Sequence, residues 1–119
     1  MPRAVDGTRR KDRRRKITSQ TKGYWGRRKN LYRTAKDALA KAGEYAYRDR
    51  KVRRRDFRRL WIARINAACR AEGITYSRFI EGLNKAEVQV NRKALSNLAI
   101  EDRDAFRELV STAQAQLKS

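Results

Sequence analysis

The sequence predicts an all-α protein in which a long basic N-terminal helical arm precedes a compact bundle of about four short helices. Charge is divided unequally, since residues 1–59 hold 23 Lys and Arg against 6 Asp and Glu, while residues 60–119 hold 9 against 7. Val, Ile and Leu follow the opposite trend, with 5 in the first 59 residues and 14 in the last 60. With a single proline, the chain is rich in Ala, Arg, Lys and Leu, which favour helix. We call residues 1–59 the basic arm and residues 60–119 the C-terminal bundle.

The composition limits the class of protein. A bundle of about 60 residues lies near the lower size limit for independent folding, so we expect marginal stability before binding. No segment approaches the ~20 apolar residues of a membrane span, and the N-terminus lacks the apolar stretch of a signal peptide. Asp6 and Asp12 are out of place in a mitochondrial presequence. We therefore expect a soluble cytoplasmic protein without a membrane partner.

The arm begins with its most basic segment. Residues 8–16 include seven cations in nine positions and no apolar side chain, so this segment alone should be disordered or a frayed helix. In the next segment Gly23 and Gly26 bracket Tyr24 and Trp25 among cations. The glycines predict a bend, and the rings are available to stack on bases or ribose. The alternative, in which the rings dock on the protein itself, has few apolar partners nearby.

A long helix is expected over residues 28–71, where there is no proline and only one glycine, Gly43. Acidic residues precede basic ones by four positions, which is the favourable orientation for helical ion pairs. Most acids of the arm are therefore interpreted as helix support rather than as catalysts. The expected pairs are Asp37 with Lys41, Glu44 with Arg48, and Asp49 with Arg53.

The cations of residues 48–59 carry the functional argument. At about 100° per residue they fall around most of the helix circumference, which leaves no apolar face to lie against protein. A ring of arginines is best explained by phosphates on several sides, as inside folded RNA. The alternative is a solvated spacer helix held by its ion pairs, but a spacer gains nothing from so high a net charge.

The bundle begins at Leu60, where an amphipathic, apolar segment follows the cations and Gly73 ends the helix. Residues 88–90 are expected as a short extended link, and Cys69 as a small core residue. Helix N-caps are expected at Thr75, Asn91 and Asp102. Apolar residues at helical spacing predict the core: Tyr76, Phe79, Ile80, Leu83, Leu95, Leu98, Phe106, Leu109, Val110 and Ala113.

Residues that support catalysis are scarce. Histidine is absent, and the single Cys69 allows neither an internal disulfide nor a soft-metal site. The glycine patterns of phosphate and dinucleotide loops are also missing. The acids of residues 101–108 could hold Mg²⁺, but at a helix start they are better interpreted as cap and dipole partners. We expect no enzyme activity, cofactor, metal or small-molecule substrate.

Several segments together closely resemble the bacterial large-subunit ribosomal protein L20 family. The resemblance covers about residues 22–100, and it departs from the family mainly before Lys16, where neutral and acidic residues interrupt the basic arm. The segments that carry it are residues 22–28, 45–50, 57–68, 73–77, 79–83, 91–95 and 98–99.

This resemblance implies a basic helical arm threaded into large-subunit ribosomal RNA, neighbouring large-subunit ribosomal proteins as partners, and a role early in subunit assembly. It also permits the C-terminal bundle to bind the chain's own messenger RNA as a repressor. The alternative is a DNA-binding architectural protein, but the leucine heptads of a zipper dimer are not seen in residues 60–119.

Trp61 marks the junction, where we expect its indole to pack on the bundle and its N–H edge to reach outward. The residues expected to contact RNA are mostly cations of the arm, with a few further residues of the bundle. They are Arg3, Arg9, Arg10, Lys11, Arg13, Arg14, Arg15, Lys16, Lys22, Gly23, Tyr24, Trp25, Gly26, Arg27, Arg28, Lys29, Arg33, Tyr47, Arg48, Arg50, Lys51, Arg53, Arg54, Arg55, Arg58, Arg59, Trp61, Arg64, Asn66, Arg70, Arg92 and Lys93.

Overall fold

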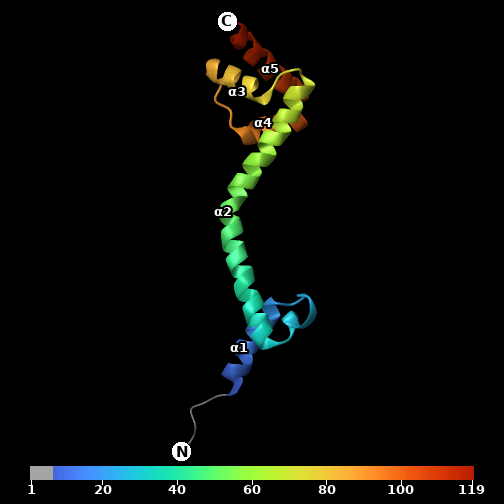
Figure 1. Ribbon diagram of the computed structural model, residues 1–119, viewed down its shortest axis with the longest axis vertical. Helices are drawn as coiled ribbons and strands as arrows, with labels where there is room; N and C mark the ends of the chain where they lie inside the picture. Colours follow the sequence, from blue (N-terminus) through green and yellow to red (C-terminus); the bar gives the residue numbers. More distant parts are fainter. Residues whose placement is uncertain (1–6) are drawn as a thin grey trace, which may run out of the picture. The chain divides into compact units, whose positions relative to one another are not determined.

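The computed structural model describes residues 7–119, and every regular element in that range is helical. Within the same range, no helix combines the length and apolarity that crossing a bilayer requires. The chain divides into two compact units, Met1–Lys51 and Val52–Ser119, and one long helix contributes to both. The predicted all-α fold is confirmed. In order, the elements are α1 (Gly7–Gln20), the 3₁₀ turn η1 (Gly26–Lys29), α2 (Tyr32–Ala71), α3 (Tyr76–Lys85), α4 (Arg92–Glu101) and α5 (Arg103–Lys118) (Figure 1).

The first unit is held together by small residues and backbone hydrogen bonds. Thr21, just after α1, is fully buried, and its hydroxyl lies 3.1 Å from the Thr18 carbonyl oxygen and 3.3 Å from that of Lys29. Ala35 at the start of α2 is the one fully buried apolar residue among residues 7–51. Because apolar side chains are scarce, this unit is held by the hydrogen bonds of Thr21 instead of by an apolar core.

The start of α2 differs from the prediction. A helix was expected from Arg28, but residues 26–29 form η1 and α2 begins at Tyr32. The Arg27 carbonyl accepts from the amides of Asn30 (3.3 Å) and Leu31 (3.1 Å), and Asn30, with a φ of -125°, interrupts the helical backbone between η1 and α2. The end of α2 at Ala71 agrees with the prediction. Residues 7–20 are helical as α1, and how this segment behaves in isolation stays a prediction.

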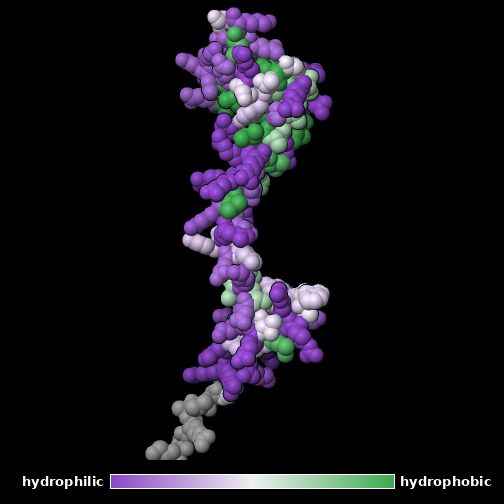
Figure 2. All heavy atoms as spheres, in the orientation of Figure 1, coloured by the Kyte–Doolittle hydropathy of each residue, from purple (hydrophilic) through white to green (hydrophobic). Residues whose placement is uncertain are grey.

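The second unit contains most of the predicted core, but Leu98, which was expected to point inward, neither forms the core nor packs against it. The last turns of α2 contribute Ile65 and Cys69, and α5 packs against both α3 and α4. On the face seen in Figure 2, hydrophobic atoms gather over these elements. The helices α3 and α5 lie in close contact at Gly82, where a Cβ atom would lie 2.5 Å from the Ala113 carbonyl oxygen. The core comprises Ile65, Cys69, Ile74, Phe79, Leu83, Leu95, Ala99, Phe106, Val110 and Ala113.

The helix ends of the second unit follow local rules. The three predicted N-caps are confirmed, since the side chains of Thr75, Asn91 and Asp102 accept from backbone amides three residues further along. Gly73 has a φ of 78° and ends α2 in a Schellman motif, with the Ile74 amide bonded to the Cys69 carbonyl at 3.0 Å.

Helix α3 ends in the same motif without a glycine. The Val88 amide donates to the Leu83 carbonyl (3.0 Å), and the Glu87 amide to that of Asn84 (3.1 Å). Glu87 therefore adopts a φ of 56°, a left-handed conformation that disfavours residues with a Cβ atom. The sequence does not signal this position, because the left-handed conformation favours glycine and the residue that adopts it here is a glutamate.

Candidate nucleic-acid interface

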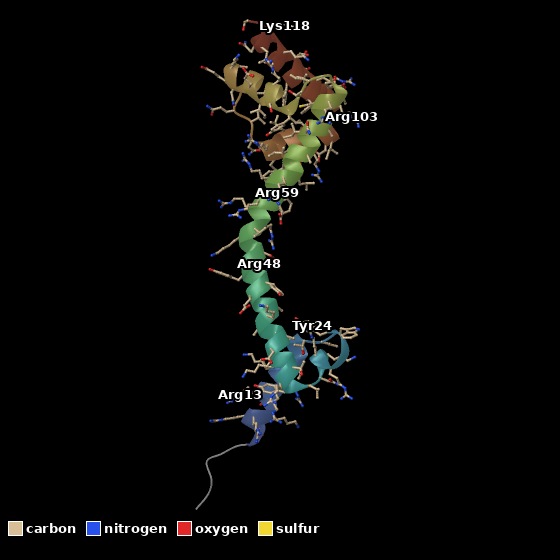
Figure 3. All side chains as sticks on the ribbon, viewed as in Figure 1. Arg13, Tyr24, Arg48, Arg59, Arg103 and Lys118 are labelled. Atoms are coloured by element: carbon tan, nitrogen blue, oxygen red, sulfur yellow. The ribbon has the colours of Figure 1, made fainter. Side chains whose placement is uncertain are left out.

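Residues 53–60 of α2 are all exposed, and five of them are arginines. Because an α-helix completes a turn in about 3.6 residues, eight exposed positions in succession leave no covered side. Across residues 7–119, these five guanidiniums have neither an acidic nor an aromatic partner. Arg59 projects from the helix in Figure 3. The five are Arg53, Arg54, Arg55, Arg58 and Arg59, and together they present uncompensated charge around the helix.

Exposed tyrosines organise the cations that precede this segment. The Lys41 ammonium and the Arg48 guanidinium lie 5.2 and 4.8 Å from the centre of the Tyr45 ring. The Lys51 ammonium lies 4.4 Å from that of Tyr47. These cation–π contacts hold long side chains close to α2, where each ring keeps about half of its surface exposed.

The ion pairs of α2 correct the prediction. Lys41 bonds to Glu44 at 3.2 Å and Arg48 to the adjacent Asp49 at 3.0 Å, whereas pairs four residues apart, Asp37–Lys41, Glu44–Arg48 and Asp49–Arg53, were expected. Exposed pairs contribute little free energy, so the Tyr45 ring can decide which carboxylate its neighbouring cations reach. Lys41 and Arg48 both lie over that ring.

The loop between α1 and η1 separates its two aromatic residues. Gly23 and Gly26 have φ values of 87° and 64°, which confirms the predicted bend. Trp25 is 91% exposed, while Tyr24 is half-buried and lines a hollow beside Ala42 of α2. Tyr24, labelled in Figure 3, therefore docks on the protein, as the alternative interpretation expected, whereas the Trp25 ring is exposed among cations.

Helix α1 exposes every cation that it contains. Residues 7–16 are exposed throughout, and Ile17 and Thr18 are half-buried where the helix meets the rest of its unit. Arg14 is partly engaged, because its guanidinium lies 5.7 Å from the centre of the Tyr32 ring. Arg3, one of the expected RNA contacts, lies outside the described residues.

Trp61 corrects the junction prediction in part. It is half-buried, but it is not among the residues that form or pack against the core. Its ring lies instead 6.1 Å from that of Phe57, one turn earlier on α2. The indole therefore packs along its own helix, and the loss of stability expected on truncation is smaller than for a core residue.

The expected contacts in the bundle fall into two groups. Arg64, Arg70 and Lys93 are exposed, whereas Asn66 and Arg92 are half-buried. The Arg92 Nε donates to the Tyr76 hydroxyl at 2.8 Å, a bond that ties the first residue of α4 to the first residue of α3. Arg92 thus has a structural role that sequence reasoning missed, because the two residues lie 16 positions apart.

Comparison with known proteins decides the family. Residues 3–109 match the family model for ribosomal protein L20. The chain belongs to the ribosomal protein L20 family. Relatives named large ribosomal subunit protein bL20 include one from Parvibaculum lavamentivorans, 60% identical over 89% of this chain and 90% of the relative, and one from Azoarcus sp., 56% identical over 98% of each. A third, from Staphylococcus carnosus, is 52% identical over 99% of this chain and the whole relative.

A ribosomal protein of this family is a structural component and not an enzyme, and its place is the cytoplasmic ribosome, as expected. Two of the acids of residues 101–108 have structural uses here. Asp102 caps α5, and Asp104 lies 3.6 Å from Arg107, which also bonds to Glu72 at 2.9 Å. The hydrogen bond that Arg107 donates to the Glu72 carboxylate raises the pKa of Arg107.

Cys69 is confirmed as a core residue. It is fully buried, and desolvation raises the pKa of its thiol from 9.0 to about 11. Since the thiolate is the nucleophilic form, a thiol that stays protonated at neutral pH is inert. The residue therefore belongs to packing rather than to chemistry.

Proposed function

We propose that this chain is a structural constituent of the large ribosomal subunit that binds ribosomal RNA through its basic arm and supports early assembly of that subunit. The family and the names of its relatives support the large-subunit assignment. One observation carries the RNA proposal: residues 53–60 are exposed on every side of a helix, and their five arginines are spread around most of its circumference. Within residues 7–119, no carboxylate pairs with these five guanidiniums.

The mechanism is electrostatic and geometric. Arginines spread around most of one helix bridge phosphates of RNA segments that would otherwise repel each other, and they release condensed counterions as they do so. The guanidinium forks pair with phosphate oxygens in two parallel hydrogen bonds. Trp25, exposed between two glycines, adds a ring on which an unpaired base stacks.

Sedimentation tests the location directly. The full chain should sediment with the large subunit through a high-salt gradient, because a protein threaded among RNA segments cannot dissociate by ion exchange at one surface. A chain that remains at the top of the gradient in high salt would contradict the proposal.

An excess of duplex DNA in the binding reaction tests the architectural DNA-binding alternative. That alternative requires that the DNA displace the chain from ribosomal RNA.

Salt dependence tests the arginines one by one. Arg53→Ala should weaken binding to ribosomal RNA and lower the slope of log affinity against log salt by about one. Lys118→Ala removes the same charge from an exposed position at the end of α5, and its slope should equal that of the unmodified chain. An unchanged slope for Arg53→Ala would mean that this guanidinium remains solvated in the complex.

The chain's own messenger RNA is a second candidate ligand, which the resemblance to the family permits to bind through the C-terminal bundle. A messenger that binds as tightly as ribosomal RNA would extend the proposal to a repressor role. Binding that is indistinguishable from that of an unrelated RNA of equal length would limit the role to the subunit.

A further inference from the structure

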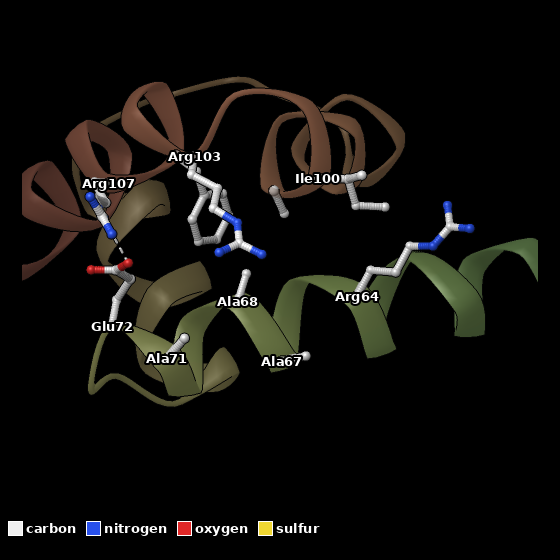
Figure 4. A pocket seen from close by; sticks show the side chains of 10 residues that line it. Arg64, Ala67, Ala68, Ala71, Glu72, Ile100, Arg103 and Arg107 are labelled. Atoms are coloured by element: carbon white, nitrogen blue, oxygen red, sulfur yellow. Dashed lines mark hydrogen bonds and ion pairs between the residues drawn. The ribbon is translucent and has the colours of Figure 1, made fainter.

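A shallow groove in the second unit is not explained by RNA binding through the arm. It has a volume of about 400 Å³ and lies between the last turns of α2 and the residues where α4 meets α5. Its floor is made of small side chains, those of Ala67, Ala68, Ala71 and Ala99 (Figure 4). Such a floor offers methyl groups and no side-chain hydrogen-bonding group.

Positive charge surrounds this floor. Arg107 is already neutralised, because it bonds to Glu72 at 2.9 Å and lies 3.6 Å from Asp104. Arg64 and Arg103 have no acidic partner among the described residues. Figure 4 shows the Arg103 guanidinium turned toward Ala68. Arg64 lies at the other end of the groove. Two free guanidiniums therefore frame an apolar floor.

An uncovered aliphatic side chain completes the groove. Ile100, the second-last residue of α4, lines it and is 58% exposed. The aromatic residue in the lining, Phe106, is 2% exposed and belongs to the core, so it gives no face on which a base can stack. RNA recognition of unpaired bases depends on stacking and on hydrogen bonds to base edges, and the aliphatic floor provides neither.

We propose that this groove binds a polypeptide segment of a neighbouring protein, with an aliphatic side chain against the alanine floor and Ile100 and a carboxylate paired with Arg103. The location of that neighbour in the large subunit rests on the function proposed above. Charge complementarity selects an acidic segment, and it disfavours a second copy of this chain, whose net charge is +19.

Site-specific crosslinking in assembled subunits tests the proposal. The photoreactive residue p-benzoylphenylalanine replaces Ile100 in the full chain, which is incorporated into large subunits, purified by sedimentation and irradiated. The crosslink should join a polypeptide segment that contains Asp or Glu within a few residues of the attachment point. The same photoreactive residue at Ala115, exposed on α5 and not part of the groove, is the control and should not give this product.

A charge reversal tests the carboxylate. In the Ile100 photoreactive chain, Arg103→Glu should lower the crosslinking yield by about tenfold, because like charges then oppose each other. Glutamate in the first turn of α5 suits the helix dipole, so the fold should be retained. Lys118→Glu makes the same change of charge outside the groove and should leave the yield unaltered.

The outcomes separate this proposal from the proposed function. A chain that does not enter the large subunit overturns the proposed function and this proposal with it. A chain that sediments with the subunit but crosslinks to RNA, to a second copy of itself, to a segment without acids or to nothing overturns this proposal alone. A yield that Arg103→Glu leaves unchanged also overturns it.

Discussion

Among the described residues, the first unit fully buries one apolar side chain, Ala35, whereas ten apolar residues form a continuous core in the second unit. Burial of apolar surface is the main favourable term in folding, so the second unit can be stable alone. The first unit instead has the hydrogen bonds of Thr21 and cation–π contacts, and the repulsion among its positive charges opposes compaction. The difference indicates that the second unit is stabilised by its own core, whereas the first unit depends on the ribosomal RNA that we propose it binds.

The largest expected effect comes from separating the two units. A fragment of residues 52–119 should unfold cooperatively, because it contains every residue of the core. A fragment of residues 1–51 should lack a cooperative transition and gain helix when RNA is added. Circular dichroism during thermal melting of both fragments measures this. A sharp melting transition of the free 1–51 fragment would remove the contrast between the units.

Truncating one large side chain in each unit should lower folding stability in one variant and RNA affinity in the other. Phe79 is fully buried with its ring 5.2 Å from that of Phe106, so Phe79→Ala should cost about 3–5 kcal/mol of unfolding free energy. Trp25→Ala removes an exposed ring and should leave the melting temperature unchanged while it weakens RNA binding. Thermal melts and RNA titrations of both variants check this, and a Trp25→Ala variant with a lowered melting temperature would mean that the ring is part of a folded contact.

Two glycines in helices should respond in opposite ways to alanine. At Gly82 a Cβ atom would overlap Ala113, so Gly82→Ala should destabilise the second unit by about 1–3 kcal/mol. At Gly43 in α2 nothing lies within 4 Å, and Gly43→Ala should raise the helix content of the arm, since alanine is favoured by about 1 kcal/mol in a helix. Denaturant unfolding and circular dichroism distinguish the two. Equal stability of Gly82→Ala and the unmodified chain would show that α3 and α5 can separate at little cost.

The smallest expected effect is a pH dependence of the second unit. Burial raises the pKa of Cys69 from 9.0 to about 11, so above pH 9 the unfolded chain releases a proton that the folded chain retains. The associated stability is complete below pH 9 and is lost as the pH rises through about 11. Cys69→Ala should therefore lose stability less steeply over this range. Melting temperatures of both proteins from pH 8 to 11 measure the difference, and parallel curves would mean that the thiol ionises without unfolding.

The sequence predicted the second unit well because its signals are local. Thr75, Asn91 and Asp102 each bond to an amide three residues away, and Gly73 ends α2 through contacts within a single turn. The core residues follow from helical spacing of apolar side chains for the same reason. One residue in this unit, Glu87, gave no such signal, because its conformation is imposed by the hydrogen bonds of its neighbours.

Prediction was weaker where several partners compete at similar energy. The ion pairs of α2 differ from those expected because Tyr45 attracts both Lys41 and Arg48, and exposed pairs differ little in free energy. Trp61 was expected on the bundle, but Phe57 one turn away offers an apolar contact within the same helix. Helical periodicity indicates on which face of a helix such a residue lies, but not which neighbouring side chain it contacts.

By itself the sequence determined the helical fold, the separation of a polycation from an apolar bundle, the helix caps and the arginines that no apolar face can cover. These follow from composition and from contacts within four residues of each other. The tertiary structure alone decided the contacts between distant segments: Arg92 with Tyr76, Arg107 with Glu72, the close approach of Gly82 to α5, and the alanine groove beside Arg103. Such contacts depend on how helices pack, which is settled by the fit of whole surfaces rather than by the spacing along any one of them.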